Sequence, residues 1–213
     1  KPRVSGHIAY RAVLPIKDVP EPVLNDDVVL WAGPKTHLVH YKLRRGEIFN
    51  IVAVFHSDKY EEGWDAFGDP KELEERFSNE RPEVHMLLDK IESWRMWVLC
   101  DREPVKTWSK GKVTLLGDAA HPMLQYLAAG AGMAIEDSVV LAELLEKNDG
   151  DFEATFKQYE QARYLRTGRV QTTARIYGDI YHAAGVVGEL RTMMLSARDP
   201  KNYDGVAWLY DGV

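Results

Sequence analysis

The chain contains 213 residues, of which 45% are hydrophobic and 28% charged, proportions typical of a globular protein with a substantial core. Its formal net charge of −6 argues against a nucleic-acid partner, because nucleic-acid-binding proteins normally present a basic face. The single cysteine, Cys100, excludes an internal disulfide, and no apolar run approaches the roughly 20 residues that span a bilayer. We therefore expect a cytoplasmic protein with no nucleic-acid partner and no membrane partner.

Four strands are predicted in the first half of the chain. Their segments are dense in Val, Ile, Tyr, Phe and Trp, and Pro, Asn and Gly separate them at short spacing. Because side chains alternate along a strand, His37 and Tyr41 share one face and His40 points the other way. Short connections, such as a tight turn at Arg45–Glu47, favour one antiparallel sheet. The four segments are 7–15 (HIAYRAVLP), 27–33 (DVVLWAG), 37–46 (HLVHYKLRRG) and 47–57 (EIFNIVAVFHS).

The second half of the chain is predicted to be richer in helices. Helical spacing follows the Asp69-Pro70 pair, and Pro82 divides this region into two short helices. Strands are expected at 94–101 and at 112–116, the second of them buried and running into Gly117. The remaining predictions are a mostly buried helix at 133–145, a long amphipathic helix at 152–182, and a helix from 185 followed by an irregular tail.

Two groups of charged residues are interpreted as solvated helix faces. One is the run KELEER at 71–76, and the other is a set of arginines on the long helix. These arginines could instead meet a partner subunit, as in a homodimer, but solvation is the simpler interpretation. The arginines are Arg163, Arg166, Arg169 and Arg175.

Most of the chemistry lies in residues 117–137, GDAAHPMLQYLAAGAGMAIED. The preceding strand delivers Gly117 and Asp118 to its carboxyl end, where ligands bind in open α/β sheets. An Asp there can accept hydrogen bonds from sugar or ribityl hydroxyls. The small residues at 128–132 precede a helix whose amides and dipole can stabilise a partly anionic ring or a phosphate. For the glycines alone, a turn that needs small residues only for packing is the favoured explanation.

The run as a whole resembles the second flavin motif of single-component (group A) FAD-dependent aromatic hydroxylases. Similarity is greatest to the branch of salicylate hydroxylase, 3-hydroxybenzoate 6-hydroxylase and 6-hydroxynicotinate 3-monooxygenase. The resemblance covers nearly the whole chain, including AYRAVLP, DREPVKTW and YEQARYLRTGRVQTTARIYGDIYHAAG. The matching motif residues are Gly117–Pro122, Met123, Gln125, Tyr126, Gly130 and Ala134–Asp137.

The resemblance implies an α+β to α/β architecture, the C-terminal portion of a p-hydroxybenzoate hydroxylase-like fold. Residues 1–105 are expected to form the substrate-domain sheet with its helices. Residues 106–150 would be the second FAD-contacting strand–turn–helix, and 151–213 a C-terminal helical region. The family's G-x-G-x-x-G turn, and the D-G motif that immediately precedes its substrate domain, are absent from this sequence. We therefore expect a missing N-terminal FAD-binding half to act as a partner, and this chain alone to bind FAD weakly or not at all.

The activity implied is hydroxylation of a small phenolic aromatic acid of the 3-hydroxybenzoate or salicylate type. It would use FAD, NADH or NADPH and molecular oxygen, through a flavin hydroperoxide. The alternative is a non-catalytic, flavin-free binding module that retains the fold. Retention of Asp118 together with His37, Tyr41 and Gln125 favours the enzyme.

The resemblance also assigns roles to residues. Asp118 would bind the ribityl or pyrophosphate part of FAD beside Gly117, and backbone amides would approach the pyrimidine edge of the flavin. Ala128-Ala129 and Gly132 depart from the family pattern, so a side-chain contact to the flavin could be lost there. The residues expected to supply these amides are Gly130, Ala131, Gly132 and Met133.

His37, Tyr41 and Gln125 are the candidate catalytic residues. His37 is the candidate general base, since an ordinary histidine pKa near 6.5 suits removal of a phenolic proton at neutral pH. Tyr41 would line the substrate pocket, and Gln125 would orient the phenol. The simpler alternatives are a half-buried strand histidine, a core aromatic residue and a polar loop residue. His121 is interpreted as a structural residue of the turn, and no metal site is expected.

Overall fold

The computed structural model describes residues 1–58, 66–199 and 201–211. The chain divides into two compact units. The sheet unit comprises residues 4–99 and 180–193, and the helical unit comprises residues 1–3, 100–179 and 194–213. Residues 180–193 belong to the sheet unit, where the amide of Lys35 donates to His182 O at 2.9 Å.

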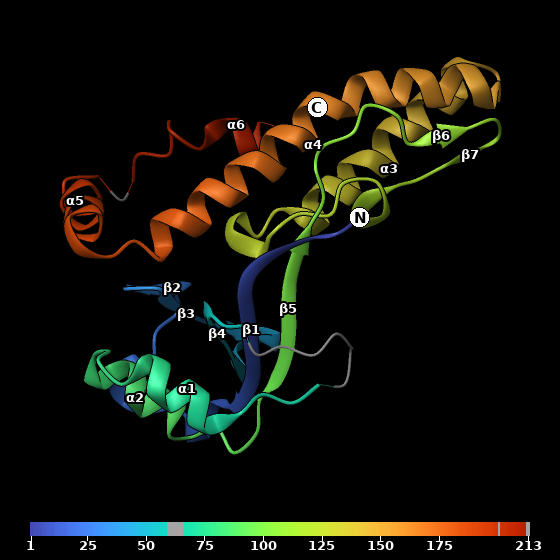
Figure 1. Ribbon diagram of the computed structural model, residues 1–213. Coiled ribbons are helices and arrows are strands. Elements are labelled where there is room, and N and C mark those ends of the chain that lie inside the picture. The colour runs from blue at the N-terminus through green and yellow to red at the C-terminus, as the bar shows by residue number, and fades with distance from the viewer. Residues whose placement is uncertain (59–65, 200, 212–213) are drawn as a thin grey trace. The chain divides into compact units, whose positions relative to one another are not determined.

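A five-stranded sheet forms the centre of the sheet unit (Figure 1). Its strand order is β2-β3-β4-β1-β5, and the β2–β3, β3–β4 and β1–β4 pairs are antiparallel, which confirms the predicted antiparallel sheet. The predicted turn is also present, since Arg44, Arg45 and Gly46 all have positive φ between β3 and β4. The strands are β1 (Arg3–Pro15), β2 (Val29–Gly33), β3 (Thr36–Leu43), β4 (Ile48–His56) and β5 (Arg95–Asp101).

Helices α1 (Pro70–Phe77) and α2 (Pro82–Leu88) cover one face of this sheet (Figure 1). The Asp69 side chain caps α1 by accepting from the amide of Lys71, and a proline begins each helix, as predicted. The charged residues of the KELEER run are exposed, as interpreted, except for Glu72. It is buried and accepts a hydrogen bond from Ser57 Oγ at 2.6 Å.

The strand alternation is as predicted. Leu38 lies in the core beneath α1 and α2, and His40 on the same face stacks on Phe49 with ring centroids 4.9 Å apart. His37 is on the opposite face, opposite Val54 of β4 in the register. The apolar core consists mainly of Ile8, Tyr10, Leu14, Leu38, Phe49, Ile51, Phe55, Leu73, Phe77, Val84, Leu87 and Trp94.

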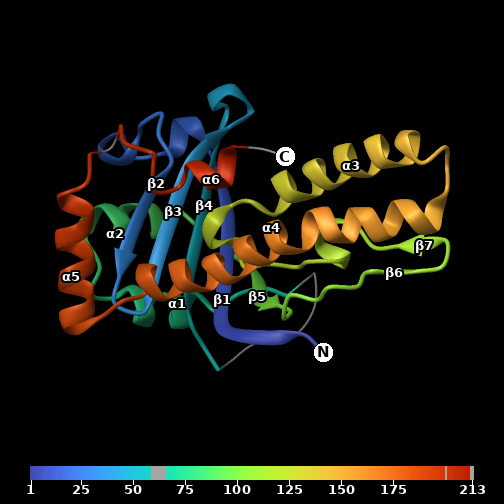
Figure 2. The same ribbon diagram turned by 90° about the horizontal axis from the view of Figure 1, so that it is seen from above.

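Two helices dominate the helical unit. Helix α3 (Gly130–Lys147) runs beside α4 (Phe152–Tyr181), as Figures 1 and 2 both show. The prediction of a mostly buried helix at 133–145 is wrong for this chain, because Ile135 and Val139 are exposed on the side of α3 that α4 does not cover. In the described part of the C-terminal tail, the short helix α6 (Ala207–Tyr210) follows.

The predicted buried strand at 112–116 is also corrected. Only β7 (Val113–Thr114) is extended and paired, and its partner is the equally short β6 (Ser109–Lys110). Val113 and Leu115 are exposed, since this two-stranded hairpin has no further strand to pack beside within the described residues. The turn that follows at Gly117 is nevertheless formed, as described below.

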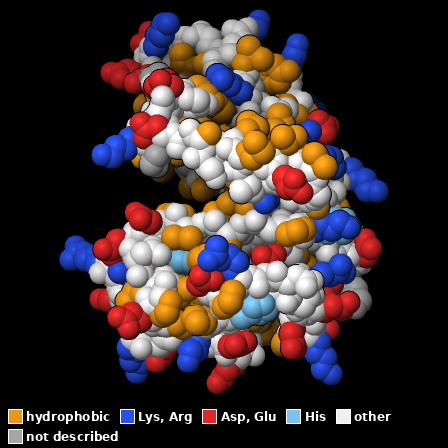
Figure 3. Space-filling view, turned by 90° about the vertical axis from the view of Figure 1, so that its left-hand side faces the viewer, with side chains coloured by type: hydrophobic (Ala, Val, Ile, Leu, Met, Phe, Trp, Pro, Cys, Tyr) orange, Lys and Arg blue, Asp and Glu red, His pale blue; other side chains and the backbone are white. Residues whose placement is uncertain are grey.

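Helix α5 (Gly185–Ser196) exposes an apolar side, where hydrophobic side chains gather on the surface (Figure 3). The exposed residues are Val186, Val187, Leu190, Met193 and Met194. Over the residues that the structure describes, no helix combines the length and the hydropathy needed to cross a membrane.

Candidate functional site

The turn at Gly117–Ala119 is a single 3-10 turn that leads from the hairpin toward α3. Gly117 has φ +57, a left-handed conformation that glycine adopts without strain. A Cβ at this position would lie 3.1 Å from Ala134 Cβ, so a larger residue would also crowd α3. Two separate constraints therefore require glycine here.

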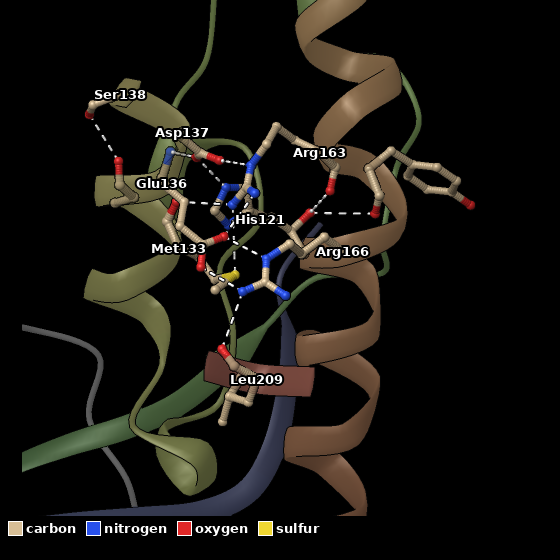
Figure 4. A network of polar contacts seen from close by, with 12 residues as sticks. His121, Met133, Glu136, Asp137, Ser138, Arg163, Arg166 and Leu209 are labelled. Atoms are coloured by element: carbon tan, nitrogen blue, oxygen red, sulfur yellow. Dashed lines mark hydrogen bonds and ion pairs between the residues drawn. The ribbon is translucent and has the colours of Figure 1, made fainter. Parts of the chain in front are cut away.

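Asp137 of α3 holds this turn in place (Figure 4). Its Oδ2 accepts hydrogen bonds from the amide of Gly117 at 3.0 Å and from His121 Nε2 at 2.6 Å. Its Oδ1 accepts from Arg163 Nε at 2.7 Å. Burial alone would raise the pKa of Asp137, but these three hydrogen bonds outweigh burial and lower it. The interpretation of His121 as a structural residue agrees with this buried contact.

Two arginines of α4 extend the network, which corrects the interpretation of these residues as solvated. Arg163 is fully buried between Asp137 and Glu136, and its Nη1 lies 2.8 Å from Glu136 Oε2. Arg166 donates to both carboxylate oxygens of Glu136 at 2.6 Å and to the backbone oxygen of Leu209 at 3.2 Å. The α4 arginines thus join α3, α4 and the tail.

Arg175 and Arg169 also make side-chain contacts within the helical unit. Arg175 donates to Asp101 at 2.7 Å, and the guanidinium of Arg169 lies 3.9 Å from the ring centroid of Trp208. The signal that could have identified Arg163 is its place on the buried stripe of α4. That stripe includes Phe156, Tyr159, Arg163, Thr167, Val170 and Ala174, which recur at helical spacing.

Asp118 lies at the edge of a cavity of about 720 Å³ within the helical unit. Its side chain is exposed, and a Cβ at Gly130 would lie 3.7 Å from its Oδ1, so the carboxylate adjoins the start of α3. Arg3 and Arg102 contribute positive charge to the cavity, and Trp108 contributes an aromatic wall. A polyol that carries phosphate suits this combination of carboxylate, cations and ring.

The first turn of α3 supplies amides beside Asp118. Among the described residues no side chain caps this helix at Ala129, and a Cβ at Gly132 would meet no described atom within 4 Å. The amides of Gly130, Ala131 and Gly132 are therefore placed to donate to an anionic or electron-rich group. Met133 differs from them, because its amide donates to Ala129 O at 2.9 Å and its side chain is buried.

Gln125 begins a 3-10 turn, Gln125–Leu127, and is half-buried. The turn closes with the amide of Ala128 donating to Gln125 O at 2.9 Å, and Ala128 adopts a left-handed conformation with φ +51. The adjacent Tyr126 is buried close to Gly178 of α4, where a Cβ would lie 2.6 Å from its ring. The neighbours of Gln125 thus fix the backbone of this turn.

His37 and Tyr41 share the face of β3 that is opposite to the core, as predicted. His37 is buried, and its Nδ1 lies 2.6 Å from Nε2 of His182. Tyr41 is half-buried and stands opposite Asn50 in the register. Gln125 belongs to the helical unit, whereas His37 and Tyr41 belong to the sheet unit.

The expectation of an ordinary pKa for His37 is wrong. Burial, with a smaller effect from His7, lowers the pKa of His37 to about 3, so its ring is neutral at neutral pH. His182, which sequence patterns did not single out, is likewise buried, and desolvation lowers its pKa well below the usual range. Among the described residues no group of histidine, cysteine, aspartate or glutamate side chains is arranged to hold a metal ion.

The family model described as "FAD binding domain" matches residues 14–174. The chain belongs to this family. It is 44% identical to the 3-hydroxybenzoate 6-hydroxylase of Polaromonas naphthalenivorans, over 98% of this chain and 52% of that protein. It is 33% identical to the 6-hydroxynicotinate 3-monooxygenase of Bordetella bronchiseptica, over 80% of this chain and 45% of that protein.

Solved structures support the fold. A salicylate hydroxylase in complex with its substrate matches all of this chain and 57% of its own, with a TM-score of 0.78 and 28% identity. HpxO of Klebsiella pneumoniae, complexed with FAD and uric acid, matches all of this chain and 55% of its own, with a TM-score of 0.85 and 21% identity. The predicted fold class and the resemblance to FAD-dependent aromatic hydroxylases are confirmed. The chain spans about half the length of the curated relatives that it matches.

Proposed function

We propose that the protein containing this chain is an FAD-dependent monooxygenase that hydroxylates a small phenolic aromatic acid, with 3-hydroxybenzoate as the first candidate. It uses NADH or NADPH and molecular oxygen. The 44% identity to a 3-hydroxybenzoate 6-hydroxylase over 98% of this chain is the observation that carries the proposal. The placement of His37 and Tyr41 on one face of the sheet supports it.

Residues of the helical unit would hold one part of the cofactor. The Asp118 carboxylate would accept hydrogen bonds from ribityl hydroxyls, and the amides of Gly130, Ala131 and Gly132 would donate to the flavin ring. The cavity beside Asp118 and the uncapped first turn of α3 fit such a group. FAD, when bound and reduced by the nicotinamide cofactor, supplies the activation of oxygen.

Residues of the sheet unit prepare the substrate. A neutral imidazole has one nitrogen that accepts and one that donates, so His37 can take the phenolic proton. Loss of this proton raises the electron density of the aromatic ring and favours its attack on activated oxygen. Tyr41, on the same face of β3 as His37, orients the phenol by a hydrogen bond. Gln125, which belongs to the helical unit, is a further candidate for this role.

Substrate-dependent NADH oxidation by the full-length, FAD-loaded protein tests this proposal. We expect 3-hydroxybenzoate to stimulate NADH oxidation more than salicylate or 6-hydroxynicotinate, and to yield a hydroxylated product in proportion to NADH consumed. Benzoate, which has no phenolic proton, is the matched control. If no hydroxylated aromatic acid gives a hydroxylated product, the proposal is refuted.

Replacement of Asp118 tests the cofactor site. Because a charge-assisted hydrogen bond contributes about 1.5–3 kcal/mol, we expect Asp118→Ala to weaken FAD binding by about 10- to 100-fold. Asp118 is exposed, so the thermal stability of the apoprotein should not change. Flavin fluorescence titration gives the affinity, and Asp149→Asn, at an exposed position after α3, is the control. An unchanged affinity in Asp118→Ala would remove Asp118 from the site.

A further inference from the structure

We propose that His182 and His7 form a proton relay that carries the phenolic proton from His37 to the protein surface, an inference that rests on the proposed function. All three histidines lie in the sheet unit. His37 is the candidate base, and His182 and His7 would be relay residues that do not touch the substrate.

The three rings form a continuous chain of contacts. His37 Nδ1 lies 2.6 Å from His182 Nε2, and His182 Nδ1 lies 3.2 Å from His7 Nε2. His56 stands opposite His7 in the β1–β4 register, with ring centroids 5.9 Å apart. The solvent exposure of these rings increases from buried His37 and His182 through half-buried His7 to exposed His56. The rings therefore connect the buried base with solvent.

The backbone around His182 is held firmly against the sheet. Its carbonyl oxygen accepts from the amide of Lys35 at 2.9 Å, in the turn between β2 and β3. The Arg191 guanidinium donates to Tyr181 O at 3.0 Å and to Ala32 O at 3.3 Å. These contacts join the end of α4 to β2 and β3, so the position of the His182 ring is set by several hydrogen bonds.

The nitrogens in contact allow a balanced transfer. Each ring begins as the Nδ1–H tautomer, and the phenolic proton binds Nε2 of His37. The Nδ1 proton of His37 then passes to Nε2 of His182, and the Nδ1 proton of His182 passes to Nε2 of His7. His7 releases its Nδ1 proton to water. The phenol becomes phenolate, one proton reaches solvent, and every ring ends neutral as the Nε2–H tautomer. Reverse transfer reprotonates the product.

Charge considerations favour this passage through neutral rings. Among the described residues, the groups around His182 include His37 of β3, His7 of β1 and His56 of β4, and Arg191 of α5 binds the carbonyls beside it. Tyr181 packs near His37 with ring centroids 5.6 Å apart. Burial lowers the pKa of both His37 and His182, so a charged imidazolium is disfavoured at either position. A relay in which every ring stays neutral avoids the free-energy cost of burying a charged imidazolium.

Proton release on substrate binding tests the relay in the full-length, FAD-loaded protein. A pH indicator in weakly buffered solution reports the proton that leaves when 3-hydroxybenzoate binds and ionises. We expect His182→Ala to slow this release by about 10- to 100-fold with little change in substrate affinity, and added imidazole to restore the rate. His7→Gln should slow it as well. His85→Gln, on α2 beneath the other face of the sheet, is the matched control and should behave as wild type.

The outcomes separate the relay from the proposed function. Wild-type release rates in His182→Ala, with normal ionisation of the bound phenol, would overturn the relay alone. Failure of every phenolic acid to bind would overturn both. Nitrogen-15 spectra of the histidine rings in the wild-type protein provide a second measurement that does not depend on a variant folding. We expect neutral rings for His37 and His182 at pH 7, and a charged ring there would also overturn the relay.

Discussion

Acidification from about pH 7.5 to about pH 5 is expected to lower the free energy of unfolding by about 2 kcal/mol for each histidine that the fold buries as a neutral ring. The pKa of His37 is about 3 and that of His40 about 4, both below the ordinary 6.5 because of burial. In the unfolded chain these rings protonate below about pH 6.5, whereas in the fold they stay neutral. The unfolded state thus binds more protons, and stability falls as the pH drops from 6.5 toward the folded pKa values.

Urea unfolding at a series of pH values measures this effect. His40 is a suitable position for a test variant, because neither of its ring nitrogens has a hydrogen-bond partner among the described residues. His40→Leu should therefore remove one titrating group and make the loss of stability on acidification shallower. His85→Gln is the control, since His85 is only half-buried. A free energy of unfolding that is constant between these pH values would contradict the prediction.

Asp137→Ala is expected to destabilise the protein by about 3–5 kcal/mol, because it leaves the fully buried Arg163 without its main partner. The amide of Gly117 and the ring of His121 would lose their acceptor as well. The turn that presents Asp118 should loosen, so FAD affinity should fall together with stability. Urea unfolding and flavin titration of the same preparation measure both effects.

A double variant makes this test sharper. Replacing a buried ion pair with apolar residues of similar size often restores stability, whereas removing one partner does not. We expect Asp137→Leu with Arg163→Met to be more stable than Asp137→Leu alone, which would reveal a coupling energy between the two positions. Asp149→Asn again serves as an exposed control. If single variants at Asp137 have a free energy of unfolding within about 1 kcal/mol of the wild-type value, the network contributes little to stability.

Local chemistry explains why much of the fold was predictable. Side-chain alternation placed His37 and Tyr41 on one face of β3 and His40 on the other, and the register confirms this. The Asp69-Pro70 pair marked the start of α1, because a capping carboxylate and a proline without an amide donor both suit a first turn. In each case the sequence pattern lies within a few residues of the structural feature that it predicts.

Features that depend on distant partners were harder to predict. The contact between His37 and His182 joins positions 145 residues apart, and no local pattern brings them together. The exposed Val113 and Ile135 look like core residues in the sequence, yet their burial depends on which elements pack beside them. Arg163 is different, because its helical spacing places it on the buried stripe of α4, and the sequence could have shown this. Its residue type argued for exposure, since arginine is rarely buried without a carboxylate partner.

The alternation of β3 has a consequence for how the protein can vary. His37, Val39 and Tyr41 face away from the core, while Leu38 and His40 between them belong to it. Under the proposed function, selection on substrate preference and selection on folding act on different, interleaved positions of the same eight-residue strand. Substitutions at the odd positions can change the ligand surface while the even positions keep the core intact. A single-residue insertion or deletion within the strand would exchange the two sets, so new specificities should arise by substitution.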